Sequence, residues 1–231
     1  MNNKKTIKIG VLGGIGPEAT SEFYHKLIFK LQDTGVIKSN LDFPQIIINS
    51  IPAPELVHET ISEADLQPYI KGLKELDSMN VDFIVMVCNT IHLFYDRLQK
   101  EINTPIIDLR NELENTIKQR KIKSTLILGT PTIVKNGLYQ FKGINSIEPD
   151  EMELKELTNA ILNFNLGKNK QKQVQKVRMV CQKYVKKDSI TIILGCTELA
   201  LMLSNEGIQK INTLDVLVEA TVKRFLAYTK K

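Results

Sequence analysis

Two cysteines occupy matching positions in the chain, and both stand where parallel strands usually carry chemistry. Cys88 follows the apolar segment 83–87 and Cys196 follows the apolar segment 190–194, and small polar residues and a helix-forming segment come next in each case. Apolar segments rich in β-branched residues are typical of buried parallel strands, whose carboxyl ends bind ligands. A helix N-terminus stabilises the thiolate, which is the reactive form of cysteine. We therefore predict that Cys88 and Cys196 are catalytic, whereas Cys181, within a lysine-rich helical segment, is structural.

The sequence around the two cysteines repeats an order of elements. A short apolar segment that ends in an aspartate, followed by a helix, comes after each cysteine, with Asp108 after Cys88 and Asp215 after Cys196; the copies are offset by roughly 108 residues. The segment 124–131 likewise resembles the first strand and turn of the chain. This self-similarity predicts an α/β protein of two like domains with central parallel sheets, related by a pseudo-two-fold axis. Such an axis would let the two cysteines face each other across the cleft between the domains, where we place the active site.

Two thiols that face one another suit the inversion of a stereocentre. One cysteine, as a thiolate, removes the proton from Cα, while the other, as a thiol, returns a proton from the opposite face. The two exchange roles when the reaction runs in the other direction. This arrangement predicts a two-base racemase.

Polar residues beside each cysteine can bind the substrate or tune the thiols. Three of them, together with nearby backbone N–H groups, can hold a carboxylate and stabilise the charge that develops at Cα, and these are Asn89, Thr90 and Thr197. His92 lies four residues after Cys88, where a helix would place it on the same face, and it either tunes that thiol or is structural. Glu198 is the matching neighbour of Cys196, and it either orients or tunes that thiol or stabilises the helix N-terminus.

Composition and motifs argue against several other classes of protein. The net charge of +5 comes from scattered lysines, and the densest group, 168–187, has no nucleic-acid motif, which favours a solvated helix face over an anionic partner. No closely spaced cysteine or histidine ligands indicate a metal site. The segment 13–16 lacks the G-x-G-x-x-G pattern of dinucleotide-binding proteins, and no lysine stands in a recognisable Schiff-base context. We expect neither a metal nor another cofactor, and no nucleic-acid partner.

The expected location is the cytoplasm. The chain has three cysteines, an odd number that does not suggest a disulfide framework. No signal-peptide pattern follows the lysines near residue 5, and no apolar stretch approaches the ~18 residues that a membrane helix needs. We therefore expect no membrane association.

Three motifs together resemble the aspartate/glutamate racemase family, and most of all its aspartate racemase branch. They are GGIGPEAT at 13–20, CNTIH at 88–92 and GCTEL at 195–199, and they follow the family's order over essentially the whole chain. The resemblance implies cofactor-independent racemisation of a small-molecule amino acid, with Cys88 and Cys196 as the acid and base. It also adds Gly14, Ile15 and Glu198 to the substrate-binding residues.

The resemblance further implies how the chain is organised. It implies a pair of α/β domains with the C-terminal helix returning to the first, and commonly a homodimer. We accordingly expect a first domain of residues 1–108 plus 206–231 and a second domain of residues 109–205.

In one respect the chain departs from aspartate racemases of this type. These usually carry an arginine after the second strand and a lysine in the second domain, which bind the side-chain carboxylate of the substrate. A hand alignment places Leu56, or a neighbour within 54–57, at the arginine position, and Asn165 or Leu166 at the lysine position, with Lys168 close by. A missing cation leaves a buried carboxylate unpaired, which is costly. The missing cations argue against strict specificity for aspartate. We therefore expect an aspartate racemase-like enzyme that acts on glutamate, on a broader range of amino acids or on a different amino acid.

Two alternatives to racemisation remain. A related isomerase of the maleate isomerase or hydantoin racemase type would use one cysteine as a nucleophile that attacks carbon. A racemase-like protein that binds an amino acid or a partner without turnover would also fit the missing arginine and lysine.

Overall fold

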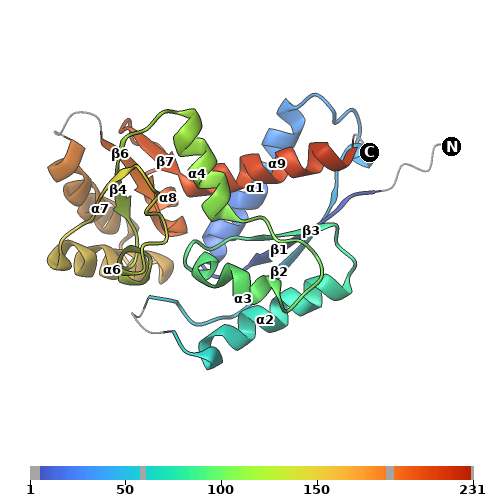
Figure 1. The fold of residues 1–231 in the computed structure, drawn as a ribbon, viewed down its shortest axis with the longest axis horizontal. Coiled ribbons are helices and arrows are strands. Elements are labelled where there is room, and N and C mark those ends of the chain that lie inside the picture. The colour runs from blue at the N-terminus through green and yellow to red at the C-terminus, as the bar shows by residue number, and fades with distance from the viewer. Residues whose placement is uncertain (1–5, 58–60, 186–189, 230–231) are drawn as a thin grey trace.

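The strands form two separate parallel sheets. The structure is a computed structural model that describes residues 6–57, 61–185 and 190–229. Its described strands are β1 (Lys8–Gly13), β2 (Gln45–Ser50), β3 (Phe83–Met86), β4 (Ser124–Leu128), β5 (Asn145–Ile147), β6 (Ile190–Leu194) and β7 (Lys210–Asn212). The first sheet has the order β2-β1-β3 and the second the order β5-β4-β6-β7, and all of these pairs are parallel. The two sheets lie in the two halves of the molecule (Figure 1).

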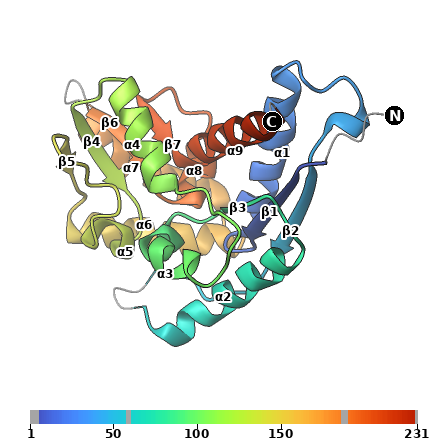
Figure 2. The ribbon, with the colours of Figure 1, turned by 45° about the vertical axis from the view of Figure 1, so that its right-hand side comes forward.

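Helices connect the strands, as parallel pairing requires. The described α-helices are α1 (Pro17–Asp33), α2 (Glu63–Ser78), α3 (Tyr95–Gln99), α4 (Leu109–Gln119), α5 (Pro131–Lys135), α6 (Glu151–Asn165), α7 (Lys170–Val185), α8 (Thr197–Met202) and α9 (Thr213–Thr229), and the described 3₁₀ helices are η1 (Asn40–Asp42) and η2 (Thr90–Phe94). Figure 2 shows α2 on one side of the first sheet and α1 on the other. The predicted α/β class with two parallel sheets is confirmed.

The two sheets share one strand order. The first two strands of each half pair with each other, and the third strand joins them on the far side of the first. In the second half, β7 extends the sheet beyond β6, and in the first half a parallel bridge between Ile84 and Ile106 occupies the corresponding place beyond β3. This common order fits the internal repeat that the sequence predicts.

Side chains of β1 alternate between two layers of core, as a strand buried on both faces must. Ile9 and Val11 belong to the apolar cluster that contains Phe23 and Leu27 of α1. Leu12 belongs to a second cluster, which contains residues from α2 and the neighbouring side of β3. The carboxyl ends of the strands are thereby held rigidly between helices.

Local capping explains where the helices begin. The Ser62 side chain accepts from the Asp65 backbone N–H, and the Asp65 carboxylate accepts from the Ser62 backbone N–H, so the two form a capping box at α2. Asp108 caps α4 by accepting from the backbone N–H of Arg110 at 3.0 Å. The helix expected after Asp108 is thereby confirmed.

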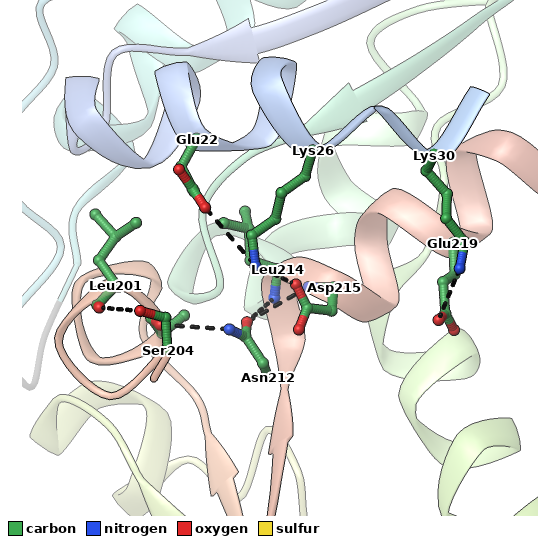
Figure 3. A network of polar contacts seen from close by, with 10 residues as sticks. Glu22, Lys26, Lys30, Leu201, Ser204, Asn212, Leu214, Asp215 and Glu219 are labelled. Atoms are coloured by element: carbon green, nitrogen blue, oxygen red, sulfur yellow. Dashed lines mark hydrogen bonds and ion pairs between the residues drawn. The ribbon is translucent and has the colours of Figure 1, made fainter. Parts of the chain in front are cut away.

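The last helix returns from the second half of the molecule to the first. Asn212, at the end of β7, accepts from the Leu214 backbone N–H at 2.9 Å and so fixes the start of α9 (Figure 3). Along its length α9 packs against α1, where Lys26 pairs with Asp215 and Lys30 lies 3.9 Å from Glu219 (Figures 1 and 3).

The boundary expected at residue 206 needs a correction, because β7 pairs with β6 and therefore belongs to the second sheet. The strand β7 extends the second sheet, and only α9, which follows it, returns toward the first half. With this change the division into two domains stays a proposal.

Three short elements complete the fold. The helix α5 begins at Pro131, which suits a first helical turn, and it ends at Lys135, before Gly137 turns the chain at φ 63°. The helix expected from about Leu93 is a 3₁₀ segment, η2, followed by the one-turn α3. The three-residue β5 was not expected. Within the described residues, no helix is long and apolar enough to cross a membrane.

Candidate active site

Both predicted catalytic cysteines line one cavity, although they come from different sheets. Cys88 follows β3 and Cys196 follows β6 at the N-cap of α8. The cavity has a volume of about 170 Å³, smaller than the pockets of drug-sized ligands and suited to a small molecule. The sequence-based expectation that the repeat brings the two thiols to a common cleft therefore agrees with the geometry.

Most of the other predicted site residues line the same cavity. Those in the lining are Gly14, Ile15, Thr90, Thr197 and Glu198. Asn89 and His92 are buried but are not part of the lining. Any role of these two in the reaction would have to act through a neighbour.

The glycine-rich turn after β1 closes one wall of the cavity. Gly14 has φ +87°, and a Cβ there would lie 2.4 Å from the carbonyl oxygen of Ile51. Gly16, with φ +82°, is the N-cap of α1, and a Cβ there would lie 2.2 Å from Oε1 of Glu198. Only glycine allows the first half of the chain to approach the Glu198 carboxylate this closely.

Glu198 is also the hydrogen-bond partner of the second cysteine. The Cys196 thiol donates to Oε2 of Glu198 at 2.8 Å, and the Thr197 hydroxyl donates to the same oxygen at 3.1 Å. Burial, followed by the charge of Glu198 and this hydrogen bond, raises the pKa of Cys196 well above its ordinary value. This arrangement favours the protonated form of Cys196.

Cys88 has different neighbours. Burial raises its pKa to about 12, and the charge of Glu198 adds to the rise. Backbone N–H groups of Thr90 and Ile91, at the start of η2, oppose this rise by hydrogen bonding to the sulfur. Cys88 thus has more donors to its sulfur than Cys196, where the backbone N–H of Glu198 is the donor that opposes the rise in pKa.

Helix N-termini were expected to stabilise the two thiolates, and burial opposes this effect. The backbone donors at Cys88 do act in the expected sense, but removing a charge from water costs more than they return. Burial therefore makes both thiols harder to ionise than a thiol in water.

Tyr139 is a site residue that the sequence did not identify. It is fully buried, its ring lies against Gly195, and its hydroxyl donates to Oδ1 of Asn89, beside Cys88. Burial raises its pKa well above the ordinary value, and the charges of both cysteines contribute, which places the phenol close to the two. Tyr139 thus joins the second half of the chain to the Cys88 segment.

Thr130 is a second residue that only the structure identifies. It follows β4 as the glycine-rich turn follows β1, and it lines the cavity. Its side chain is 2% exposed, and its hydroxyl has no hydrogen-bond partner within the described part of the chain. Because buried polar groups are nearly always paired, this hydroxyl is a candidate partner for a polar ligand atom. The repeat of the 6–16 pattern at 124–131 was the signal that could have found it.

His92 packs against the first sheet. Its Nε2 lies 3.4 Å from the carbonyl oxygen of Met86, and its ring stacks on Tyr95 at a centroid distance of 6.5 Å. Burial lowers the pKa of His92 to about 4, so the ring is neutral near pH 7. It supports the turn that follows Cys88, and tuning of that thiol by His92 stays a prediction.

The positions where a substrate-binding arginine and lysine were sought do face the cavity. Leu56 lines it from the loop after β2, and Asn165 and Leu166 line it from the end of α6. Lys168 is not part of the lining, and the described lining contains neither lysine nor arginine. Among residues 6–57, 61–185 and 190–229, no group of three or more histidine, cysteine or acidic residues could hold a metal ion.

The model of one protein family matches residues 12–221 of the chain, a span that contains both cysteines and the whole cavity lining. The chain belongs to the Asp/Glu/hydantoin racemase family. The resemblance seen in the three motifs is thereby confirmed, and with it the expectation of an isomerase of the racemase class.

Relatives of this racemase family cover nearly the whole chain. The broad specificity amino-acid racemase RacX of Bacillus subtilis (strain 168) is 27% identical over 227 residues, which is 95% of this chain and 99% of that protein. The aspartate racemase of Picrophilus torridus has a structure that superposes with a TM-score of 0.77 at 23% identity, covering 94% of both chains. An aspartate racemase homologue from Pyrococcus horikoshii OT3 has a TM-score of 0.68 at 25% identity, covering 97% of this chain and 99% of its own.

Proposed function

We propose that this protein racemises a free α-amino acid by two-base proton transfer between Cys88 and Cys196, without a cofactor. One observation carries the proposal: two buried thiols, each at the end of a strand in a different sheet, line one small cavity. A stereocentre bound between them would have a thiol on each face. Membership of the racemase family supports the same reaction.

The proposed reaction balances protons as follows. The Cys88 thiolate removes the Cα proton of one enantiomer and becomes a thiol, and the Cys196 thiol gives its proton to the opposite face of Cα and becomes a thiolate. The other enantiomer is converted by the reverse transfer. The hydrogen bond from Cys196 to Glu198 and the backbone donors at Cys88 support this assignment of the resting acid and base.

The substrate itself supplies the charge that the thiols lack. An α-ammonium group entering the cavity would favour a thiolate beside it and so offset the burial that raises both thiol pKa values. Thr90 and Thr130 line the cavity, and their hydroxyls are suited to bind the α-carboxylate. Charge that develops on this carboxylate during proton removal would be stabilised by these fixed donors.

The family resemblance also supports a cytoplasmic homodimer. All three cysteines are free thiols, which suits a reducing compartment. Light scattering of the purified protein would give the mass of one or two chains directly.

The proposal is tested by proton NMR of the α-proton in D₂O, with a panel of amino acids supplied singly. We expect loss of the α-proton signal of at least one amino acid, and no loss with the Cys88→Ser/Cys196→Ser double variant. No loss across the panel by the reduced protein would contradict racemisation and favour a binding protein. A mass increase on one cysteine after incubation with substrate would instead favour an isomerase with a nucleophilic cysteine.

A further inference from the structure

Two loops of the cavity lining are free of the proposed acid–base machinery. One is 53–57, after β2, and the other is the end of α6 at 165–166. Neither contains a cysteine or a threonine, so these loops are available to recognise the part of the substrate beyond Cα. The arginine and lysine of aspartate racemases would lie in these same two loops.

The charge of the lining is negative. Its charged residues are Glu55 and Glu198, and the described lining contains no lysine or arginine. Glu198 is already engaged, because Cys196 and Thr197 both donate to it. Glu55 is exposed, is part of the cavity lining and forms no ion pair with any described residue.

Lysines near the second loop do not reverse this charge. Lys170 pairs with Glu18, and its ammonium lies 4.7 Å from the centre of the Phe164 ring. Lys168 stays outside the lining. An anionic side chain bound here would face carboxylates without a counter-ion, whereas a cationic side chain would find one.

We infer that the substrate is an amino acid whose side chain carries a positive charge at the end of an aliphatic stem, and that Glu55 binds this charge. The inference rests on the proposed racemase function and names its substrate class. Leu56 and Leu166 supply apolar surface for the stem, and Glu55 supplies the carboxylate for a terminal ammonium or guanidinium. The buried Thr130 hydroxyl, which has no partner among the described residues, independently indicates that this cavity takes a polar ligand.

The test compares substrates that differ in charge but little in shape. Racemisation of lysine is compared with that of norleucine, and racemisation of glutamate with that of glutamine, by chiral chromatography of initial rates. We expect kcat/KM to be highest for lysine, intermediate for norleucine and glutamine, and lowest for glutamate. Because Glu55 is exposed, we expect Glu55→Gln to lower the lysine-to-norleucine ratio of kcat/KM by about two- to five-fold.

Matched variants isolate the role of Glu55. Glu156→Gln removes an exposed carboxylate of α6 outside the cavity lining and should leave the ratio unchanged. Glu55→Lys should lower kcat/KM for lysine and raise it for glutamate.

The outcomes distinguish the substrate class from the reaction. Racemisation of glutamate at least as fast as of lysine would overturn the inference and leave the proposed function intact. A preference for lysine that survives Glu55→Gln would overturn the role of Glu55. No racemisation of any of the four amino acids, together with no α-proton exchange in a wider panel, would contradict the proposed function itself.

Discussion

The two halves of this protein place a cysteine at the same point of the same strand order, yet they surround it differently. In the first half, backbone N–H groups of Thr90 and Ile91 point to the Cys88 sulfur. In the second half, the Cys196 thiol donates to the Glu198 carboxylate at 2.8 Å. Donors stabilise a thiolate, whereas an adjacent carboxylate stabilises a thiol.

This difference shows how a repeated fold can supply an acid and a base from one residue type. Burial raises the pKa of both thiols, but their hydrogen-bond partners differ. Backbone N–H groups of Thr90 and Ile91 oppose the rise at Cys88, whereas the Glu198 carboxylate accepts the thiol hydrogen of Cys196 and adds to the rise there. A pair of titratable groups whose surroundings separate their pKa values is the pattern expected of an acid and its base. Because the two thiols interact, an apparent pKa measured by titration belongs to the pair and not to one cysteine.

The largest effect should come from removing either thiol. Cys88→Ser and Cys196→Ser should each lower kcat/KM for racemisation by about 10²–10⁴-fold, because each removes one of the two proton-transfer groups. Chiral chromatography of initial rates measures this loss.

Cys181→Ser is the matched control for these variants. Cys181 is also a buried free thiol, but it lies in α7 and outside the cavity lining. Its variant should keep kcat/KM near the wild-type value. A near-normal rate for Cys88→Ser or Cys196→Ser would contradict the proposed proton-transfer role of that cysteine.

A smaller loss is expected where the two halves meet. An alanine at Gly16 would place its Cβ 2.2 Å from Oε1 of Glu198, and so displace the carboxylate from Cys196. A displacement of this size near reacting groups lowers rates by about 10²-fold, and we expect this fall in kcat for Gly16→Ala.

Gly143→Ala separates this clash from backbone strain. Gly143 has φ +81°, nearly the same as Gly16, but a Cβ there would meet no atom within 4 Å. Both variants should lose about 1 kcal/mol of unfolding free energy in urea denaturation, while only Gly16→Ala should lose activity. Equal activity of the two variants would contradict the role of the Gly16–Glu198 contact.

The link between the halves through Tyr139 should matter less. Tyr139→Phe leaves Oδ1 of Asn89 without its buried donor, which costs about 1–3 kcal/mol. Because Asn89 is next to Cys88, we expect roughly a ten-fold fall in kcat/KM together with this loss of stability. Tyr184→Phe, which removes a hydrogen bond to Glu153 outside the cavity lining, is the control for a stability loss without an activity loss.

The smallest effect should be a shift in pH dependence. Removal of the Glu198 charge by Glu198→Gln lowers the pKa of Cys196, since that charge raises it. Where Cys196 acts as the acid it must be protonated, so the alkaline limb of the kcat/KM profile should move to lower pH. An alkaline limb at the same or higher pH would contradict the assignment, and Glu156→Gln serves again as the control.

The parts of the site that the sequence predicted are those encoded by neighbouring residues. The apolar strand before Cys88, the turn after Cys196 and the caps at Ser62 and Asp108 each depend on a few adjacent positions. The repeat of these local patterns was enough to predict that both thiols reach one cleft.

The parts that the sequence did not predict depend on contacts between distant residues. Tyr139 reads as an ordinary core aromatic until the fold brings its hydroxyl to Asn89, 50 residues away. The direction of the thiol pKa shifts depends on how completely the folded chain excludes water, which no local pattern encodes. The negative charge of the lining also depends on the fold, because Glu55 and Glu198 come from distant parts of the chain and both line the cavity.

The central claim, that two bases act on opposite faces of Cα, is tested most directly by the fate of the α-hydrogen in D₂O. One enantiomer of a substrate is supplied, and deuterium in each enantiomer is measured by chiral chromatography and mass spectrometry during the first few per cent of conversion. Two-base transfer predicts deuterium at Cα of the newly formed enantiomer, while the remaining substrate keeps its protium. Deuterium at equal levels in both enantiomers, or protium retained in the product, would show that one base serves both faces and would contradict the account.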